Sequence, residues 1–358
     1  MLGQMIKWSN ILMKKLDKIE VDANKCQKVR AVVSSCSACM DVCPAGAITI
    51  GQDSLAINDG CMECGLCTNV CPTNALKWND PPLMQIFQRI RRLAEKEADI
   101  YIACASSVKG KAMANVAEVP CLGMLPWEFW LAAGVYAPNL QIVFQPSTCR
   151  NCSFHGGEGL FLKEKQQAEE ILGSRFSLGK AVSEAKADSQ VDYSRRKLFI
   201  TFWEEVKETN TITVKETLSA GKTLSPFEKY ARHHEKEAGL KEMEETAEEI
   251  KNRMADKWLG GQVIHTDKRA LLLRALEKKP ELQERITLSV PEMKESCTRC
   301  DACAFLCPTD AIVIDGNSYI LSTEKCVSCG LCGEICYEKH IHMKPASAAI
   351  LREKYVFY

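Results

Sequence analysis

The sequence has no long uncharged apolar run. Among its 358 residues no window approaches the roughly 18 apolar residues that a transmembrane helix requires. The first twenty residues mix apolar and basic side chains at helical spacing, and they lack the apolar core and cleavage site of a signal peptide. We therefore expect an N-terminal helix over residues 1–22 and no membrane span.

Net charge is also lacking. The chain has 46 Lys and Arg against 46 Asp and Glu, without a concentrated basic stretch, which argues against a nucleic-acid partner. Nucleotide signatures are missing, because the HGGEG segment at residues 155–159 has neither a G-x-G-x-x-G register nor a terminal Gly-Lys-Ser. The C-x3-C-x2-C run of radical S-adenosylmethionine chemistry is absent too. Chemistry on a substrate is therefore expected on another protein.

Cysteine is what the sequence has in excess. Its 20 cysteines fall in tight C-x2-C steps separated by wide gaps, which is typical of metal ligation and not of a disulfide framework. Thiols that bind iron must stay reduced, so we expect a reducing, cytoplasmic compartment. The cysteines form one group near each end of the chain, with four more between them.

The C-terminal group contains two complete C-x2-C-x2-C-x3-C runs, separated by eighteen residues. This spacing is typical of a two-cluster [4Fe-4S] module, in which the fourth cysteine of each run binds the other cluster. One cluster is expected on Cys297, Cys300, Cys303 and Cys336, and the other on Cys307, Cys326, Cys329 and Cys332. Tyr337 replaces the usual proline, which we expect to change a turn but no ligand.

The N-terminal group is an imperfect copy of this module. Its second run is complete, but Val33 stands where the first run should begin, and Cys26 is the obvious substitute ligand. The crossover rule assigns Cys26, Cys36, Cys39 and Cys71 to one cluster, and Cys43, Cys61, Cys64 and Cys67 to the other. Structural zinc is the alternative, but three-step runs ending in Cys-Pro favour iron–sulfur cubes.

Between the two groups, strand and helix patterns alternate. Strands are expected at residues 99–103, 116–119 and 140–144, and helices at 83–97, 125–134 and 160–172, which predicts a small parallel sheet. The remaining cysteines are Cys104, Cys121, Cys149 and Cys152, all just after strands. Loops in this position line the ligand crevice of an open α/β sheet. One more metal centre is predicted there, with structural zinc or free thiols as alternatives.

This stretch resembles the iron–sulfur domain of the delta subunit of methyl-viologen-reducing hydrogenase, which also occurs fused to heterodisulfide reductase subunits. The similar segments are IYIAC, ending at Cys104, VPCLGMLPWEFWLAAG, containing Cys121, and STCRNCSFHGGEG, containing Cys149 and Cys152. The resemblance implies a [2Fe-2S] cluster on these four cysteines, although the last pair is more closely spaced than in that family. We interpret the neighbouring His155 as a loop residue and not as a ligand.

The predicted fold class is α+β multidomain, with two ferredoxin-like 2[4Fe-4S] modules, a small α/β domain between them and a helical linker region. Residues 177–192 read as a linker, and helices are expected at 194–208, 226–257 and 268–276, the last near the C-terminal module. The predicted domains are a helix (1–22), a ferredoxin-like module (23–80), a delta-subunit-like domain (81–175), a charged helical region (176–290) and a second ferredoxin-like module (291–358).

Ferredoxin-type clusters are enclosed by four thiolates, so their ordinary work is electron transfer and not substrate binding. We predict an iron–sulfur electron-transfer subunit, not catalytic alone, with four [4Fe-4S] clusters and one [2Fe-2S] cluster. It would serve a cytoplasmic oxidoreductase complex, hydrogenase-like or heterodisulfide-reductase-like by resemblance, whose other subunits carry flavin, molybdopterin or nickel-iron sites. The alternatives are a redox enzyme acting on a disulfide or sulfur compound at the middle cluster, and an iron–sulfur redox sensor.

Overall fold

The computed structural model describes residues 18–108, 113–179, 182, 266–294, 296–316, 318–351 and, for the backbone, 354–357. All of these belong to one compact unit. The helices predicted at 194–208 and 226–257, and most of the one predicted at 1–22, lie outside the described residues. None of the described helices has the length and apolar character needed to cross a membrane.

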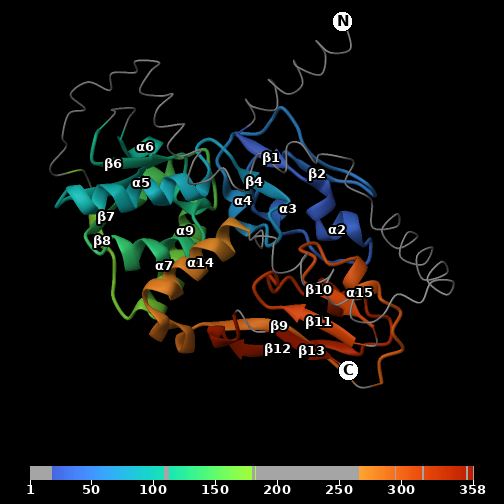
Figure 1. Cartoon of the computed structure of the whole chain (residues 1–358). Helices are drawn as coiled ribbons and strands as arrows, with labels where there is room; N and C mark the ends of the chain where they lie inside the picture. The colour runs from blue at the N-terminus through green and yellow to red at the C-terminus, as the bar shows by residue number, and fades with distance from the viewer. Residues whose placement is uncertain are drawn as a thin grey trace, which may run out of the picture. The chain divides into compact units, whose positions relative to one another are not determined.

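The N-terminal module has two small antiparallel ladders with short helices between them (Figure 1). Its strands are β1 (Ile19–Val21) paired with β4 (Leu76–Trp78), and β2 (Ile48–Ile50) paired with β3 (Leu55–Ile57). Its helices are η1 (Ala23–Lys25), α2 (Gln27–Arg30), α3 (Ala38–Val42) and α4 (Leu66–Val70). The helix predicted over 1–22 is wrong at its end, because Ile19–Val21 is drawn into an extended ladder by pairing with β4.

The middle domain is built on a four-stranded, fully parallel sheet in the order β6-β5-β7-β8. The strands are β5 (Ile100–Cys104), β6 (Val116–Val119), β7 (Leu140–Val143) and β8 (Ser177–Gly179). The first three lie where the apolar pattern predicted them, and the central β5 is buried from Ile100 to Ala103. Strand β8 corrects the predicted linker, since a short, mostly exposed edge strand has no apolar run to signal it.

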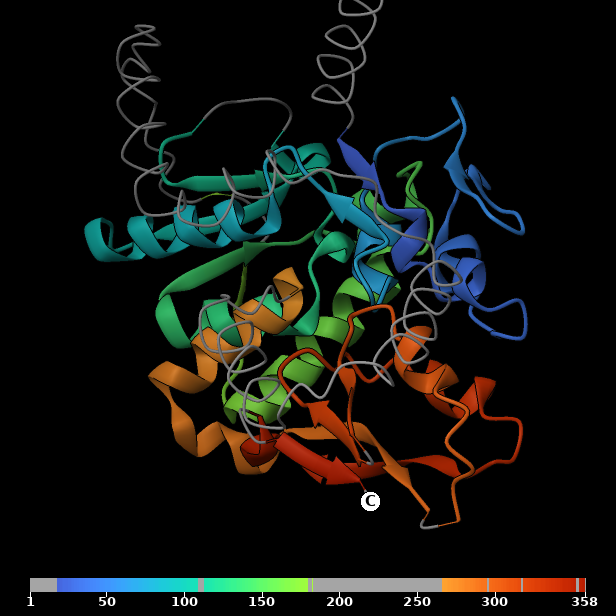
Figure 2. The same ribbon diagram turned by 45° about the vertical axis from the view of Figure 1, so that its right-hand side comes forward.

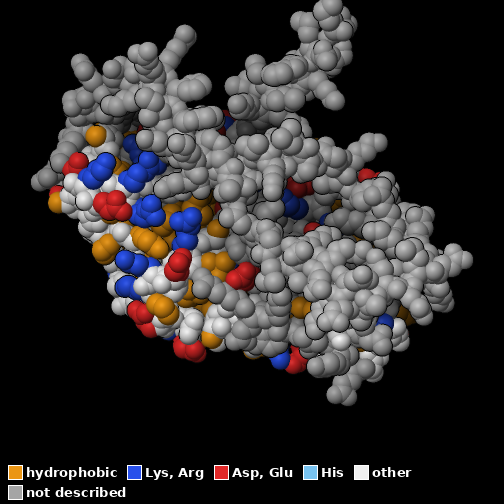
Figure 3. All heavy atoms as spheres, viewed as in Figure 1, with side chains coloured by type: hydrophobic (Ala, Val, Ile, Leu, Met, Phe, Trp, Pro, Cys, Tyr) orange, Lys and Arg blue, Asp and Glu red, His pale blue; other side chains and the backbone are white. Residues whose placement is uncertain are grey.

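Helix α7 (Trp127–Tyr136) is the centre of this domain. It packs between α9 (Gly157–Leu172), α14 (Asp267–Lys278) and α5 (Leu83–Lys96), and Figures 1 and 2 both show α14 running beside it. Aromatic rings fill the contact, with Trp130 and Phe161 centred 5.5 Å apart. On the face seen in Figure 3, Lys and Arg side chains gather over the part of the domain that carries α5. The shorter helices are α6 (Ala105–Val108), η2 (Leu122–Met124) and α8 (Pro146–Arg150).

The C-terminal module repeats the plan of two ladders. Its strands are β9 (Thr287–Met293) paired with β12 (Ile341–Ser347), and β10 (Ile312–Asp315) paired with β11 (Ser318–Ser322), which also pairs with β13 (Lys354–Phe357). Its helices are η3 (Pro280–Arg285), which precedes it, α15 (Ala302–Phe305), α16 (Leu331–Ile335) and η4 (Ala348–Ile350). Strand β9 begins before the predicted boundary at residue 291, and β13 pairs the tail with β11.

Helix α14 was expected to pack near the C-terminal module. Its apolar residues Leu271, Leu272 and Ala275 are buried in a core that is shared by the middle domain, the N-terminal module and, through Leu288, Ala348 and Leu351, the C-terminal module. Arg269, in its first turn, donates a hydrogen bond to the C-terminal module, at the Cys326 carbonyl. The helix thus lies near the C-terminal module as predicted, and it also packs on α7, a partner that the spacing of an amphipathic stripe does not encode.

Candidate iron–sulfur sites

Three of the C-x2-C loops share one backbone conformation. In each, the residues directly before and after the second cysteine are left-handed, namely Glu63 and Gly65, Arg299 and Asp301, and Ser328 and Gly330. This conformation turns backbone N–H groups toward sulfur: Glu63 N lies 3.5 Å from Cys61 Sγ, and Arg299 N lies 3.4 Å from Cys297 Sγ. Hydrogen bonds of this kind stabilise the negative charge of a metal-bound thiolate.

A second turn recurs after the fourth cysteine of every run. The residue three positions later is left-handed in all four, at Gly46, Asn74, Asp310 and Lys339. The next N–H then donates to the cysteine sulfur, as from Ala311 to Cys307 at 3.2 Å and from His340 to Cys336 at 3.3 Å. Tyr337 therefore does not change this turn, contrary to the sequence-based expectation.

The first run of the N-terminal module departs from this pattern. Ser37, which follows its second-position cysteine, has a φ of −132° in place of the left-handed value. Burial raises the pKa of Cys39 to about 11, and the thiolates of Cys71, Cys26 and Cys36 raise it too. The structure thus brings together the four cysteines of the predicted first quartet, with Cys26 buried and Val33 69% exposed.

The second quartet of this module surrounds a small cavity. Cys43, Cys61, Cys64 and Cys67 line it together with apolar side chains that include Ile19, Ile48 and Ile57. Burial, followed by the thiolates of Cys64, Cys61, Cys43 and Cys39, raises the pKa of Cys67. Because Cys39 belongs to the first quartet, the two quartets of this module are neighbours. Four inward thiolates around a space, with N–H donors on sulfur, fit a [4Fe-4S] cube.

The C-terminal module holds its cysteines in two similar groups. Burial raises the pKa of Cys329 to about 12, and the thiolates of Cys307 and Cys326 add to the shift. The same three cysteines raise the pKa of Cys332, after burial. In the other group, burial and then Cys297 and Cys300 raise the pKa of Cys303 to about 12. Cys303 belongs to the core of this module, against which Cys336 packs together with Cys307, Cys326 and Cys332, and Cys300 is exposed.

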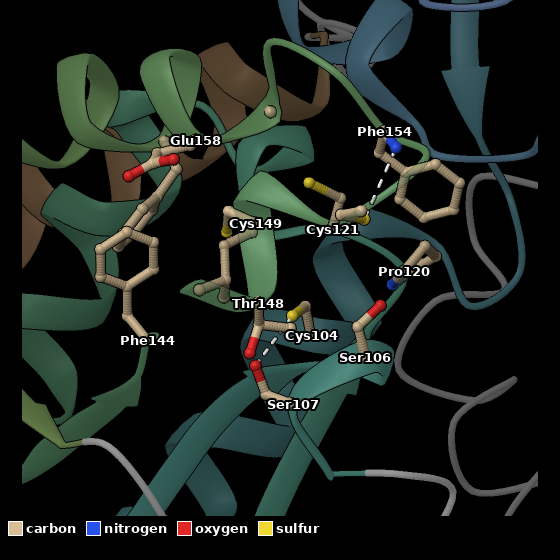
Figure 4. A pocket seen from close by; sticks show the side chains of 14 residues that line it. Cys104, Ser106, Ser107, Pro120, Cys121, Phe144, Thr148, Cys149, Phe154 and Glu158 are labelled. Atoms are coloured by element: carbon tan, nitrogen blue, oxygen red, sulfur yellow. Dashed lines mark hydrogen bonds between the residues drawn. The ribbon is translucent and has the colours of Figure 1, made fainter. Parts of the chain in front are cut away.

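The four middle cysteines line one pocket at the carboxyl edge of the parallel sheet (Figure 4). Cys104 ends β5, Cys121 follows β6, and Cys149 and Cys152 follow β7. Burial raises the pKa of Cys121 to about 12 and that of Cys149 to about 11. Cys104 Sγ lies 3.1 Å from Ser107 Oγ, and Phe154 N donates to Cys152 Sγ at 3.5 Å. His155 is exposed and does not line the pocket.

The pocket lies directly against the N-terminal module. A Cβ atom added at Gly157 would lie 2.6 Å from Cys121 Sγ, so only glycine fits beside this thiol. Cys104, Cys64 and Cys152 all act on the pKa of Cys121, and Cys64 belongs to the second quartet of the N-terminal module. Asn69 of that module donates to the Gly123 carbonyl at 2.8 Å. The middle site and the second quartet are therefore adjacent.

Three basic side chains near the quartets were missed by the sequence analysis. Lys268 Nζ donates to the carbonyls of Asn69 and Cys71, the latter at 2.8 Å, and Arg269 donates to the carbonyl of Cys326. Arg30 Nε donates to the carbonyl of Leu306 at 3.1 Å. We call Arg30, Lys268 and Arg269 the basic junction. The only sequence signal was a Lys-Arg pair at a helix start.

Part of the chain is matched by family models. A model described as a 4Fe-4S dicluster domain matches residues 34–76, and one described as a 4Fe-4S binding domain matches residues 290–313. A ferredoxin-like protein in the nif region of Sinorhizobium fredii is 46% identical over 33 residues, which span 9% of this chain and 52% of that protein. No solved structure matches the chain.

No group of three or more His, Cys, Asp and Glu side chains in the described part of the chain is placed to hold a single metal ion. The recurrent turns and the matches agree on a different kind of centre. The chain contains two ferredoxin-type 4Fe-4S domains, one on each side of the middle domain.

Proposed function

We propose that this chain relays electrons through five iron–sulfur centres as a subunit of a larger oxidoreductase. The observation that carries this proposal is the adjacency of the cysteine groups. The thiolate of Cys64 raises the pKa of Cys121 in the middle site, and the thiolate of Cys39 raises the pKa of Cys67, so each pair of thiols lies close together. Arg30 follows Cys26 by four residues, and the thiolates of Cys307 and Cys329 in the C-terminal module raise its pKa. Adjacent centres provide a continuous path for one-electron transfer.

The middle cysteines would hold the fifth centre, a [2Fe-2S] cluster by resemblance. When bound, such a cluster supplies a one-electron redox couple. The chain's own contribution is to set its surroundings: apolar Phe144, Leu122 and Phe161 line the pocket, and the Phe154 N–H donates to Cys152. Burial and N–H···S bonds both influence the potential of an iron–sulfur centre. Since thiols must stay reduced for assembly, we place the chain in the cytoplasm.

The partners proposed are subunits that carry flavin, molybdopterin or nickel-iron chemistry, in a hydrogenase-like or heterodisulfide-reductase-like assembly. The delta-subunit resemblance supports this context. Each ferredoxin-type centre uses all four of its thiolates on its own cluster, which leaves substrate chemistry to a partner.

Iron and sulfide analysis with EPR of the reduced protein tests the five centres. We expect about 18 irons in the full chain and about 16 in Cys121→Ser, with loss of one [2Fe-2S] signal. Cys300→Ser is the matched control, because it should disturb only a C-terminal cubane signal. An unchanged spectrum in Cys121→Ser would contradict the fifth centre. Useful turnover of a disulfide by the purified chain alone would favour the enzyme alternative.

A further inference from the structure

One quartet of the C-terminal module receives two arginines from outside that module. Arg30, on α2 of the N-terminal module, donates to the carbonyls of Leu306 at 3.1 Å and Phe305 at 3.4 Å, directly before Cys307. Arg269, on α14, donates to the carbonyl of Cys326 itself. Two separate elements thus place guanidinium groups on the loops that carry Cys307 and Cys326.

Both groups hold a permanent charge close to these thiols. A guanidinium is not deprotonated in proteins, and Arg269 is only 6% exposed, so solvent screens it weakly. Burial lowers the pKa of Arg30, while Asp310, Cys307, Asp22 and Cys329 raise it. Burial likewise lowers the pKa of Arg269, while Cys326, Glu128 and Glu324 raise it. Burial also raises the pKa of Glu128 on α7.

The other quartet of the C-terminal module, its sibling, consists of Cys297, Cys300, Cys303 and Cys336 and has different surroundings. Its Cys300 is exposed, whereas the four cysteines of the Cys307 quartet are all partly buried. Acidic groups occur near both quartets, with Asp301 acting on Cys303 here, and Asp310 and Glu324 acting on the two arginines there. The sibling's own basic neighbour is Arg299, whose guanidinium carbon lies 5.9 Å from the Tyr319 ring centroid. Water screens charges around this quartet more strongly than around the one that Arg269 contacts.

We propose that Arg30 and Arg269 raise the reduction potential of the cluster on Cys307, Cys326, Cys329 and Cys332 above that of its sibling, and so direct electrons to the boundary with the N-terminal module. The inference rests on the proposed relay. Reduction adds one negative charge to a cluster, and a nearby cation stabilises that charge. Each step moves one electron from a reduced to an oxidised cluster and needs no proton or co-reactant.

Lys268, next to Arg269 on α14, contacts the N-terminal module at its boundary with the C-terminal module. Its ammonium group donates to the carbonyl of Cys71, a member of the quartet with Cys26, Cys36 and Cys39. Glu334 on α16 of the C-terminal module is among the groups that raise the pKa of Cys36, a member of the same quartet. A cluster held by Cys307, Cys326, Cys329 and Cys332 would thus be placed to exchange electrons with one held by the Cys71 quartet.

EPR-monitored redox titration of the full chain tests the proposal with Arg269→Met and Arg30→Met, after iron analysis of each variant. We expect each change to lower the reduced-to-oxidised ratio of one C-terminal cluster about tenfold at fixed potential, which is 59 mV for a one-electron couple. Arg269→Lys and Arg30→Lys keep the charge and should restore most of the ratio. A structural role alone would not separate Met from Lys in this way.

Arg299→Met is the matched control, since it removes a cation beside the other quartet. It should shift the second C-terminal signal and leave the first unchanged. Unchanged potentials in Arg30→Met and Arg269→Met, with all clusters present, would overturn this inference and leave the relay intact. If Arg269→Met loses its cluster, Arg30→Met decides, because the carbonyls to which Arg30 donates, those of Asn24, Phe305 and Leu306, belong to residues outside the ligand set. Absence of the C-terminal clusters from the unmodified chain would overturn the proposed function itself.

Discussion

The two ferredoxin-type modules follow one plan but obtain their stability differently. In each, the outer strands pair with one another, as β1 with β4 and β9 with β12, and the inner strands pair as a hairpin. The C-terminal ladder β9–β12 spans seven residue pairs against three for β1–β4, and the module has its own core around Val290, Tyr319 and Ile341. Leu76 of the N-terminal module instead shares one core with Phe87 and Phe129. The N-terminal module is therefore stabilised by its contact with the middle domain.

The modules also differ in one ligand, and this difference has a structural consequence. The C-terminal run begins with Cys297 in a standard loop, whereas the N-terminal run reaches back to Cys26. The segment between Cys26 and Cys36 carries Arg30 to the C-terminal module. In the same segment, the backbone N–H of Ser35 donates to the Glu334 carboxylate at 3.3 Å. The displaced cysteine thus gives the N-terminal module a segment that contacts its counterpart.

Substitution of Cys26 should have the largest effect on this comparison. Cys26→Ser should lose about four irons, the content of one [4Fe-4S] cluster, because serine oxygen is a poor ligand for these irons. Cys297→Ser should do the same in the C-terminal module. Full iron content in Cys26→Ser would show that the two modules do not share a four-cysteine requirement.

Restoring the missing cysteine should not repair the site. In Cys26→Ser with Val33→Cys, residue 33 is exposed and Ser37 lacks the left-handed conformation of the other loops. We expect iron content to stay at the level of Cys26→Ser, as measured by iron and sulfide analysis. Recovery of the fourth cubane would mean that the two modules have interchangeable loops.

A glycine occupies the same position of the cluster loop in both modules, but the space around it differs between them. Gly65 and Gly330 have φ values of 76° and 77°, so alanine at either costs about 1 kcal/mol or more in backbone energy. A Cβ at Gly65 would lie 2.9 Å from the Met124 Cβ, whereas a Cβ at Gly330 would have no atom of the described residues within 4 Å. Gly65→Ala should lower the free energy of unfolding about 1–3 kcal/mol more than Gly330→Ala in denaturant titrations. Equal losses would contradict a close contact between the N-terminal module and the middle domain.

Tyr337→Pro should have the smallest effect. The side chain is 95% exposed, and the turn after Cys336 already matches those that follow the Cys-Pro pairs, with Lys339 at a φ of 55°. We expect iron content to stay unchanged and the melting temperature to stay within a few degrees. Loss of a cluster would mean that the tyrosine sets the position of Cys336.

Local patterns predicted much of this fold. Apolar runs located β5, β6 and β7, and the parallel order followed from their alternation with helices. The two cysteine runs of each module located its ligand loops. Short polar or edge segments such as β1 and β8 carry no such pattern, because their pairing depends on neighbours distant in sequence. The same limit hid the basic junction, since nothing in a Lys-Arg pair indicates that its partners are the carbonyls of Cys71 and Cys326.

The site was predictable to a similar degree. Spacing and the crossover rule grouped the ferredoxin cysteines, and the structure brings Cys26, Cys36, Cys39 and Cys71 together as one such group. The middle site depended on a resemblance and on strand ends, and no spacing rule indicated that it lies beside Cys64. Contacts between modules require the three-dimensional arrangement.

The most direct test of the relay is the number of electrons that one chain accepts. In an anaerobic reductive titration of the full chain followed by EPR, we expect about five one-electron equivalents, and about four in Cys121→Ser. The C-terminal cluster that loses potential in Arg269→Met should reduce before its sibling in the unmodified chain. Uptake of about two electrons, or equal uptake by the chain and by Cys121→Ser, would contradict a relay of five connected centres.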